Sequence, residues 1–261
     1  MRMYPLSTRL TQKTLSNPVL WGKIALILYS VVYLIHVWIF PASALDRGVG
    51  LSAEVNVGGS LATGNTNTTR FDAEVKARLK SGRIEDNYRL AVEFGDDNGT
   101  TAAQRILGSA ESRLDVQDNL VVFGFLEYDD DRFSGFKHEF EGSLGAGYKI
   151  IDNQSMRFLL QAGPSYRISK LSGLNTTNNE FGIRGSVDFE YKISETSTLA
   201  NIATVTWDNS RSMLENTLSL TSELFGGLST RFSYNVRHNS SPPTLTQKTD
   251  TLTKAVLVYA F

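Results

Sequence analysis

The last residues of the chain, KTDTLTKAVLVYAF at positions 248–261, alternate between two kinds of side chain and end on an aromatic ring. The two rows point to opposite faces, because successive side chains of a β-strand alternate. One face carries Thr253, Ala255, Leu257, Tyr259 and Phe261, and the other mixes Asp250 and Lys254 with Val256 and Val258. This ending is typical of the closing strand of a bacterial outer-membrane barrel. Tyr259 and Phe261 are then the candidate signal for the barrel-assembly machinery.

The same alternation recurs at 71–80, 88–94, 215–224 and 231–237. Its clearest example sets Phe181, Ile183, Gly185, Val187, Phe189, Tyr191 and Ile193 against Glu180, Gly182, Arg184, Ser186, Asp188, Glu190 and Lys192. In a soluble β-sandwich such an apolar row would pack against a second sheet. Alternation alone therefore leaves that alternative open.

Three further features favour a barrel in a membrane. The alternating stretches run for about ten to fifteen residues, whereas soluble strands average about five or six. The polar rows mix both signs of charge at close spacing, as a polar barrel interior does. Aromatic residues gather near the expected strand ends, where an interfacial girdle would need them: Phe94, Tyr128, Phe133, Tyr148, Tyr166, Tyr191 and Trp207.

Composition excludes several other classes of protein. The 261 residues carry a net charge of -1 and 20% charged side chains, which disfavours both a disordered chain and a nucleic-acid binder. The sequence contains no Cys, so disulfides, Cys-based metal sites and thiol nucleophiles are absent. This composition suits a protein of the cell envelope.

Residues 1–44 have the pattern of a secretory signal peptide. Their only charges are positive, an apolar run follows at 24–40, and the small residues Ala42-Ser43-Ala44 form a cleavage site. We therefore expect cleavage after Ala44 and a barrel over 45–261. An uncleaved signal anchor is the alternative, and the long basic segment before Lys23 is also compatible with a misassigned start codon.

Turn-forming residues divide the mature chain into segments. Short links are expected at 82–86, 117–119, 152–154, 194–197 and 226–227, and longer ones at 63–67, 96–102, 129–136, 169–178, 208–213 and 239–247. Eleven links that alternate between short and long predict an all-β fold, a transmembrane antiparallel up-and-down β-barrel of about twelve strands. An even number of strands places both termini in the periplasm.

Several motifs resemble a known family. They are GNTNTT at 64–69, DRFSG at 131–135, GAGY at 145–148, AGP at 162–164 and the ending NSSPPTLTQKTDT followed by LVYAF. In this order they resemble the YdiY-like salt-induced outer membrane proteins, a domain-of-unknown-function family, over roughly 51–261. The resemblance implies a porin-like barrel in the outer membrane and a link to salt or osmotic stress. Ser241 departs from the acidic residue expected before the two prolines, and the N-terminal extension is unusually long.

The polar rows supply the candidate functional residues. We expect a charged row facing the lumen, formed by Arg70, Glu74, Arg78, Arg89, Glu93, Arg113, Glu139, Glu141, Arg184, Asp188, Glu190 and Arg231. About twelve strands lie between the eight that side chains fill and the sixteen that leave an aqueous channel. The row is therefore compatible with a small, weakly selective pore and with a barrel plugged by its own ion pairs.

Other chemistry has weaker support in the sequence. No cofactor is expected. An enzyme acting on lipid or peptide is the alternative function, with His138 or His238 beside Ser134, Ser240 or Asp131, although no nucleophile motif supports it. Asp129, Asp130 and Asp131 form a candidate contact for a divalent cation. Lipopolysaccharide and the lipid of the outer membrane are the expected partners.

Overall fold

The computed structural model describes residues 50–63, 68–97, 100–132, 134, 136–171, 176–242 and 246–261. The predicted signal peptide at 1–44 lies outside these residues. Within them the chain forms twelve strands: β1 (Gly50–Thr63), β2 (Thr68–Ser81), β3 (Ile84–Asp97), β4 (Thr100–Asp115), β5 (Leu120–Asp131), β6 (Phe136–Asp152), β7 (Met156–Leu171), β8 (Thr177–Lys192), β9 (Ser197–Asp208), β10 (Ser212–Phe225), β11 (Leu228–Asn239) and β12 (Thr249–Ala260). None of the described residues belongs to a helix that could cross a membrane.

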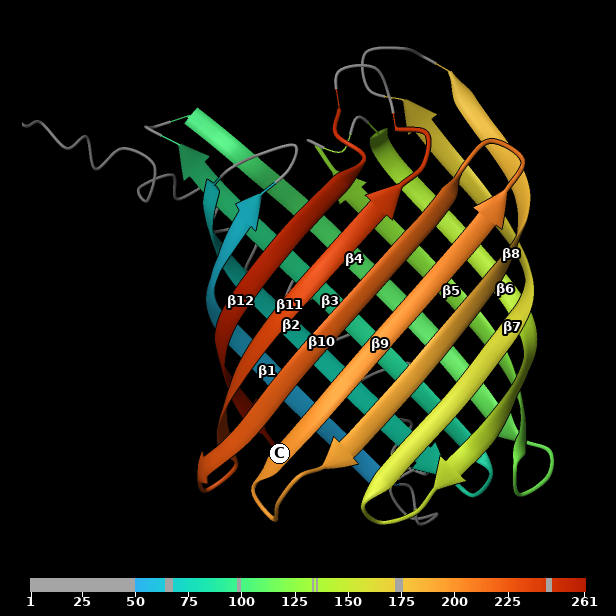
Figure 1. Cartoon of the computed structure of the whole chain (residues 1–261), viewed down its shortest axis with the longest axis vertical. Coiled ribbons are helices and arrows are strands. Elements are labelled where there is room, and N and C mark those ends of the chain that lie inside the picture. Colours follow the sequence, from blue (N-terminus) through green and yellow to red (C-terminus); the bar gives the residue numbers. More distant parts are fainter. Residues whose placement is uncertain are drawn as a thin grey trace, which may run out of the picture. The chain divides into compact units, whose positions relative to one another are not determined.

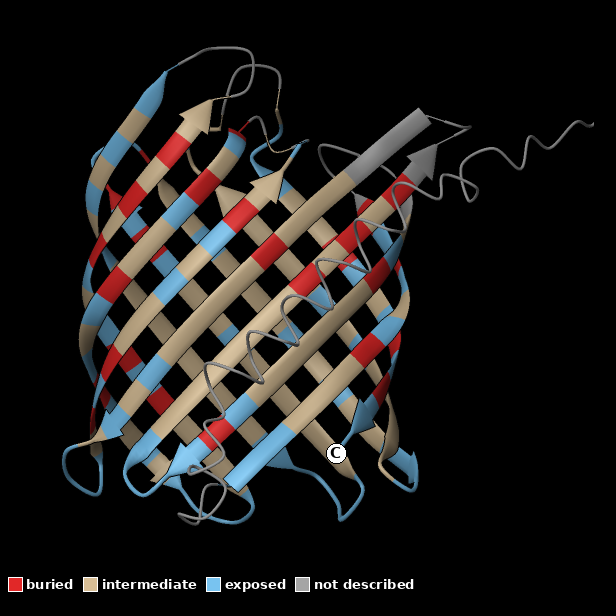
Figure 2. Ribbon diagram, turned by 180° about the vertical axis from the view of Figure 1, so that it is seen from behind, coloured by how far each residue is buried: buried red, intermediate tan, exposed pale blue. Residues whose placement is uncertain are grey.

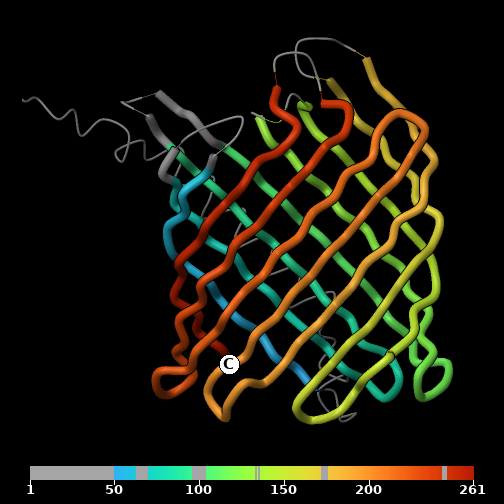
Figure 3. Tube along the Cα trace, in the orientation of Figure 1, coloured from blue at the N-terminus to red at the C-terminus, as the bar shows by residue number. Residues whose placement is uncertain are grey.

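The strands close into one antiparallel barrel, as the sequence predicts (Figure 1). Each strand pairs with its neighbours in the chain, and β12 pairs with β1 over a register that runs from Glu54↔Ala260 to Thr63↔Thr251. Beyond this register, Ala53 and Phe261 exchange two backbone hydrogen bonds of 3.0 Å. The predicted closing strand therefore forms the seam, the β1–β12 pairing at which the two ends of the sheet meet (Figure 3).

The barrel has two rims. The terminal rim is the one at which β1 begins and β12 ends, and the distal rim is the opposite one. All eleven predicted links overlap a link of the structure, but the predicted contrast in length is weaker than expected. β3 continues to Asp97 and β4 starts at Thr100, so only residues 98–99 separate them. Strand pairing needs only backbone groups, and polar residues such as Thr100 therefore extend the ladder past the apolar rows.

The apolar rows face outward. Phe181 and Ile183 are 74% and 57% exposed, and Phe261 is 67% exposed. Exposed residues alternate with buried or intermediate ones along strands such as β7 and β12, and Figure 2 shows these classes on the strands. The soluble sandwich is therefore wrong for this chain, because the described residues form a single closed sheet and leave the apolar rows uncovered.

Aromatic side chains face outward near both rims. Tyr128 and Trp207 are exposed toward the distal rim, and Tyr148 and Tyr191 toward the terminal rim. Phe133, another residue expected in such a girdle, lies outside the described residues. Two aromatic belts separated by an apolar band are the pattern of a barrel that spans a bilayer.

Two of the motifs seen in the sequence meet on neighbouring strands. GAGY at 145–148 lies on β6 and AGP at 162–164 lies on β7, with Ala146 opposite Ala162. A Cβ atom added at Gly145 would lie 2.2 Å from the carbonyl oxygen of Ala162, and one at Gly163 would lie 2.0 Å from a carbonyl oxygen of β6. The two backbones thus approach more closely than any side chain permits, which explains why both motifs need glycine here.

Candidate functional site

The barrel encloses a cavity of about 710 Å³ lined by residues of all twelve strands. Its lining reaches from Ser52 near the terminal rim to Arg237 near the distal rim. Twelve acidic and ten basic side chains take part in the lining. The interior is therefore a nearly balanced charged surface, with a small excess of acid.

The structure places the predicted charged row on this surface. Eleven of its members line the cavity: Glu74, Arg78, Arg89, Glu93, Arg113, Glu139, Glu141, Arg184, Asp188, Glu190 and Arg231. The twelfth, Arg70, lies 3.4 Å from Glu93, measured from Nη1 to Oε2. The alternation along each strand thus gives the direction in which these side chains point, although it says nothing of their partners.

Near the distal rim one ion pair crosses the lumen. Asp129 of β5 accepts hydrogen bonds from Arg105 of β4, with Nε to Oδ1 at 2.9 Å and Nη2 to Oδ2 at 2.8 Å. Arg237 of β11 donates to the same Oδ2 at 3.2 Å. β5 and β11 are six strands apart in a ring of twelve and so belong to opposite walls. Asp129, Arg105 and Arg237 are here called the distal bridge.

Closer to the terminal rim, other contacts cross the lumen between strands four apart. Arg113 of β4 lies 3.5 Å from Asp188 of β8, and Arg157 of β7 lies 3.4 Å from Glu85 of β3. These two ion pairs are the terminal bridges. Together with the distal bridge they narrow the cavity at two levels.

The seam is held from inside by ion pairs that reach over intervening strands. Lys254 of β12 passes over β1 to Asp72 and Glu93, with Nζ to oxygen distances of 3.0 and 2.7 Å. Arg231 of β11 passes over β12 to Glu54 of β1, through two contacts of 2.8 and 3.0 Å. A charge-assisted contact of this kind is stronger than a neutral hydrogen bond. The interior charges therefore also serve to close the barrel.

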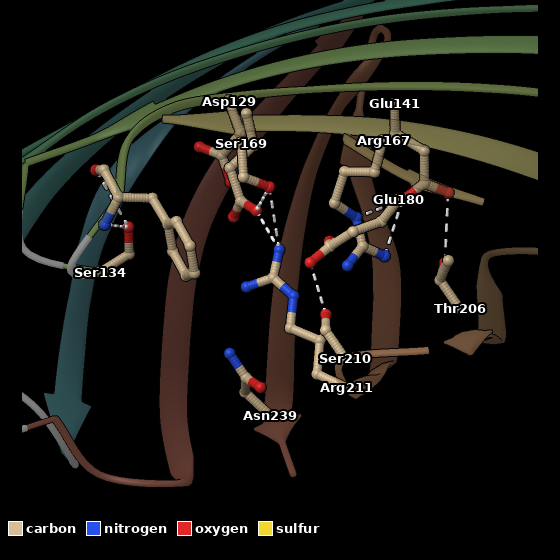
Figure 4. Close-up of polar contacts among 12 residues, drawn as sticks. Asp129, Ser134, Glu141, Arg167, Ser169, Glu180, Thr206, Ser210, Arg211 and Asn239 are labelled. Atoms are coloured by element: carbon tan, nitrogen blue, oxygen red, sulfur yellow. Dashed lines mark hydrogen bonds and ion pairs between the residues drawn. The ribbon is translucent and has the colours of Figure 1, made fainter. Parts of the chain in front are cut away.

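Side chains of the link between β9 and β10 contact residues of β6 and β7 near the distal rim, and Figure 4 shows Arg211 pointing toward Ser169. Asp208 accepts hydrogen bonds from the backbone of Ser210 and Arg211 at 2.9 and 2.8 Å and pairs with Arg167 at 3.0 Å. The Arg211 side chain is buried, contacts Glu139 and lies 4.3 Å from the centre of the Phe136 ring. Its Nε and Nη1 have no hydrogen-bond partner among the described residues.

Sequence reasoning missed several members of this network. Arg237 has the same strand parity as the predicted Arg231 on β11, so the alternation could have identified it. Glu54 on β1 and Arg157 and Arg167 on β7 lie on strands for which no lumen residue was predicted. Arg211 lies in a link, where the strand period does not apply, and the sequence gives no signal for it.

The candidate cation contact does not assemble. Asp129 points into the lumen and is engaged by two arginines, whereas Asp130, its neighbour on the strand, has the opposite parity and faces outward. In the described part of the chain no group of three His, Asp or Glu side chains could hold a metal ion. The three aspartates thus lack the convergence that a cation site needs.

The contacts seen for the two histidines are with an aromatic ring and with a threonine. His138 stacks on Tyr128 with ring centres 6.3 Å apart, and His238 Nδ1 lies 2.8 Å from Thr249 Oγ1. Neither of these two contacts involves a serine or an aspartate. The pairing on which the enzyme alternative depends is therefore not seen there.

The protein therefore belongs to the class of closed antiparallel β-barrels, with an apolar exterior and a charged interior. Residues 55–261 match the DUF481 family, described as proteins of unknown function, and the chain belongs to that family. No curated protein matches the chain. The narrower YdiY-like resemblance therefore remains a prediction.

Solved structures share the fold at low sequence identity. The NanC porin is 9% identical, with 78% of this chain and 98% of that chain covered and a TM-score of 0.54. An outer membrane channel from Pseudomonas putida is also 9% identical, with 81% and 95% covered and a TM-score of 0.50. At this identity the likeness concerns the fold alone.

Proposed function

We propose that this protein is a non-enzymatic channel of the bacterial outer membrane that passes ions and small solutes. The observation that carries the proposal is the charged cavity, which all twelve strands line and which extends toward both rims. At about 30 Å³ of liquid volume for each water, the cavity has room for on the order of twenty water molecules. This volume supports a hydrated path through the interior, narrowed by the bridges.

Outer-membrane placement is supported by the exterior. Large apolar side chains are exposed on the outward face of the described strands, which a soluble monomer rarely tolerates over such an area. The aromatic belts at the two ends would lie at the two membrane interfaces. In this placement the terminal rim faces the periplasm and the distal rim faces the outside. The porin and the channel that share the fold agree with this proposal.

The aromatic end of the chain supports a role in assembly. Tyr259 and Phe261 face outward, with ring centres 6.0 Å apart, and are accessible to the barrel-assembly machinery. We expect Phe261→Ser to lower the amount of protein in the outer membrane severalfold while leaving refolding in detergent almost unchanged. Quantitative immunoblots of membrane fractions, with refolding yields measured beside them, test this. Equal losses in both assays would show that Phe261 serves stability rather than recognition.

Single-channel recording in a planar bilayer tests the channel. We expect discrete conductance steps from the refolded protein, and a weak preference for cations because the lining has an excess of two acidic side chains. Under a roughly tenfold gradient of KCl, the reversal potential should have the sign of a cation-selective pore but be much smaller than the value for perfect cation selectivity.

The salt response implied by the family resemblance would appear as higher abundance of the protein in cells grown at high salt.

Absence of conductance steps would contradict the channel. The protein used must first show the altered mobility of a folded barrel in unheated gel samples. A folded but silent barrel would indicate a scaffold that its bridges plug, and a strongly anion-selective pore would contradict the charge balance read from the lining.

A further inference from the structure

Four side chains form a basic patch on the outward side of the distal rim. Arg132 follows β5, Lys137 and His138 lie at the start of β6, and Lys170 lies near the end of β7. Arg132 and Lys137 are exposed, and Lys170 and His138 are half-buried. These four residues are called the rim patch.

Strand register places the patch on the outside of the barrel. His138 pairs directly with Lys170. Their neighbours Glu139 and Ser169 are buried inside the barrel, where they share a hydrogen bond of 2.8 Å. Because successive side chains alternate, His138 and Lys170 face outward. Lys137 lies at a register shift of β6 and projects into solvent.

The patch is held in place by several contacts. Arg132 Nη1 donates to Gln104 Oε1 at 2.8 Å, and its backbone nitrogen donates to the Gln104 carbonyl at 3.2 Å. Ser134 Oγ donates a hydrogen bond to the Asp131 carbonyl at 3.0 Å and accepts one from the Phe136 nitrogen at 3.3 Å. Arg132 is therefore tied to β4 through both its side chain and its backbone.

Aromatic residues lie directly below the patch on the outward surface. Tyr128 of β5 pairs with Phe140 of β6, and Tyr166 of β7 pairs with Phe181 of β8. Lys170 is four residues beyond Tyr166, which corresponds to about 10 Å along the membrane normal for a strand tilted as in other barrels. Interfacial rings mark the edge of the hydrocarbon, so the cations reach the level of the lipid headgroups.

The patch has a clear preference for anions. Asp130 is an acidic side chain of the same outward surface, two residues from Tyr128 on β5. Among the described residues of this outward surface, the three permanent cations Arg132, Lys137 and Lys170 thus outnumber the carboxylate of Asp130. Lysine and arginine bind phosphate through charge-assisted hydrogen bonds, and clustered basic residues at a membrane surface bind anionic headgroups.

We propose that the rim patch binds the phosphate groups of lipopolysaccharide in the outer leaflet. This inference rests on the outer-membrane placement of the proposed function, but it does not require that the barrel conducts. The occupant is a lipid whose acyl chains lie against the aromatic row while its phosphates meet Arg132, Lys137 and Lys170.

The test measures binding of purified deep-rough lipopolysaccharide to the full-length protein in detergent, with EDTA present to remove bridging divalent cations. The variant neutralises the patch through Arg132→Gln, Lys137→Gln and Lys170→Gln. We expect affinity to fall about fivefold for each cation and on the order of 100-fold for all three. Dephosphorylated lipid should bind the parent protein and the variant equally, because the phosphates supply the difference. Inorganic phosphate alone should compete poorly, because it lacks the acyl chains.

A matched control carries the same change in charge at the terminal rim, where three exposed cations are available: Lys80→Gln, Arg83→Gln and Lys192→Gln. It should keep its affinity within about twofold, because these residues lie far from the patch. Equal binding by the patch variant and the parent would overturn the proposal. An equal loss in both variants, or binding that disappears with EDTA, would also overturn it. Unheated gel mobility verifies the fold of each variant, and conductance is recorded separately, so a silent channel does not affect this result.

Discussion

Replacing Gly58 with alanine is expected to prevent most of the protein from closing its barrel. Gly58 lies on β1 opposite Val256 of β12 in the seam. A Cβ atom at this position would lie 2.2 Å from the carbonyl oxygen of Ala255 and 2.6 Å from Cα of Val256. Both are backbone atoms, so the clash cannot be relieved by a change of rotamer. β1 must move away from β12, at a cost of about 3 kcal/mol or more.

The measurement is the folded fraction after refolding in detergent, followed by its urea unfolding midpoint. Gly59→Ala is the matched control, because it makes the same change one residue away on the same strand. A Cβ at Gly59 would lie 3.5 Å from the nearest atom, the carbonyl oxygen of Arg70, which is an ordinary contact. We expect the control to refold like the parent protein. Normal refolding of the Gly58 variant would show that the seam can shift its register without loss.

The faces of the strands could be predicted from the sequence for a simple reason. A period of two gives the direction of each side chain without any knowledge of which strands are neighbours. The row from Phe181 to Ile193 therefore indicated a lipid-facing surface, and the row that ends at Phe261 indicated the closing strand. Gly58 gave no such signal, because its close approach to Val256 depends on the register across the seam.

Link lengths were predicted less well than link positions. Turn-forming residues mark where a strand can end, but pairing between neighbouring backbones decides where it does end. Polar residues of the predicted loop at 96–102 pair as strand, with Asp97 opposite Thr100.

The sequence predicts which charged side chains point into the interior of the barrel, but it does not predict which of them form ion pairs. Arg113 and Asp188 both point inward by parity, yet they are 75 residues apart in sequence and meet only because the sheet closes. The same holds for Asp129, which the sequence grouped with Asp130 and Asp131 in an acidic cluster. In the structure the strand period separates these neighbours, and Asp129 meets Arg237 of the opposite wall.

Replacing Arg237 with serine is expected to raise the single-channel conductance by about twofold or more, because the side chain that crosses the lumen is removed. Folding should be preserved. Asp129 keeps both hydrogen bonds to Arg105, so no buried carboxylate is left without a partner. The lining loses one cation, and the preference for cations should therefore increase as well. Planar-bilayer recordings under symmetric and asymmetric KCl measure both quantities on the same channels.

Arg78→Ser separates the effect of charge from the effect of the bridge. Arg78 also lines the cavity, but its contacts are to Asn87 and Glu85 on the adjacent strand β3, at 3.1 and 3.9 Å. The Arg78→Ser substitution removes the same charge without removing a contact across the lumen, so the conductance of this variant should stay near that of the parent protein. A larger conductance in both variants would assign the effect to charge alone. An Arg237 variant with changed selectivity and unchanged conductance would show that ions pass beside the distal bridge, and that the narrowest part of the path lies at the terminal bridges instead.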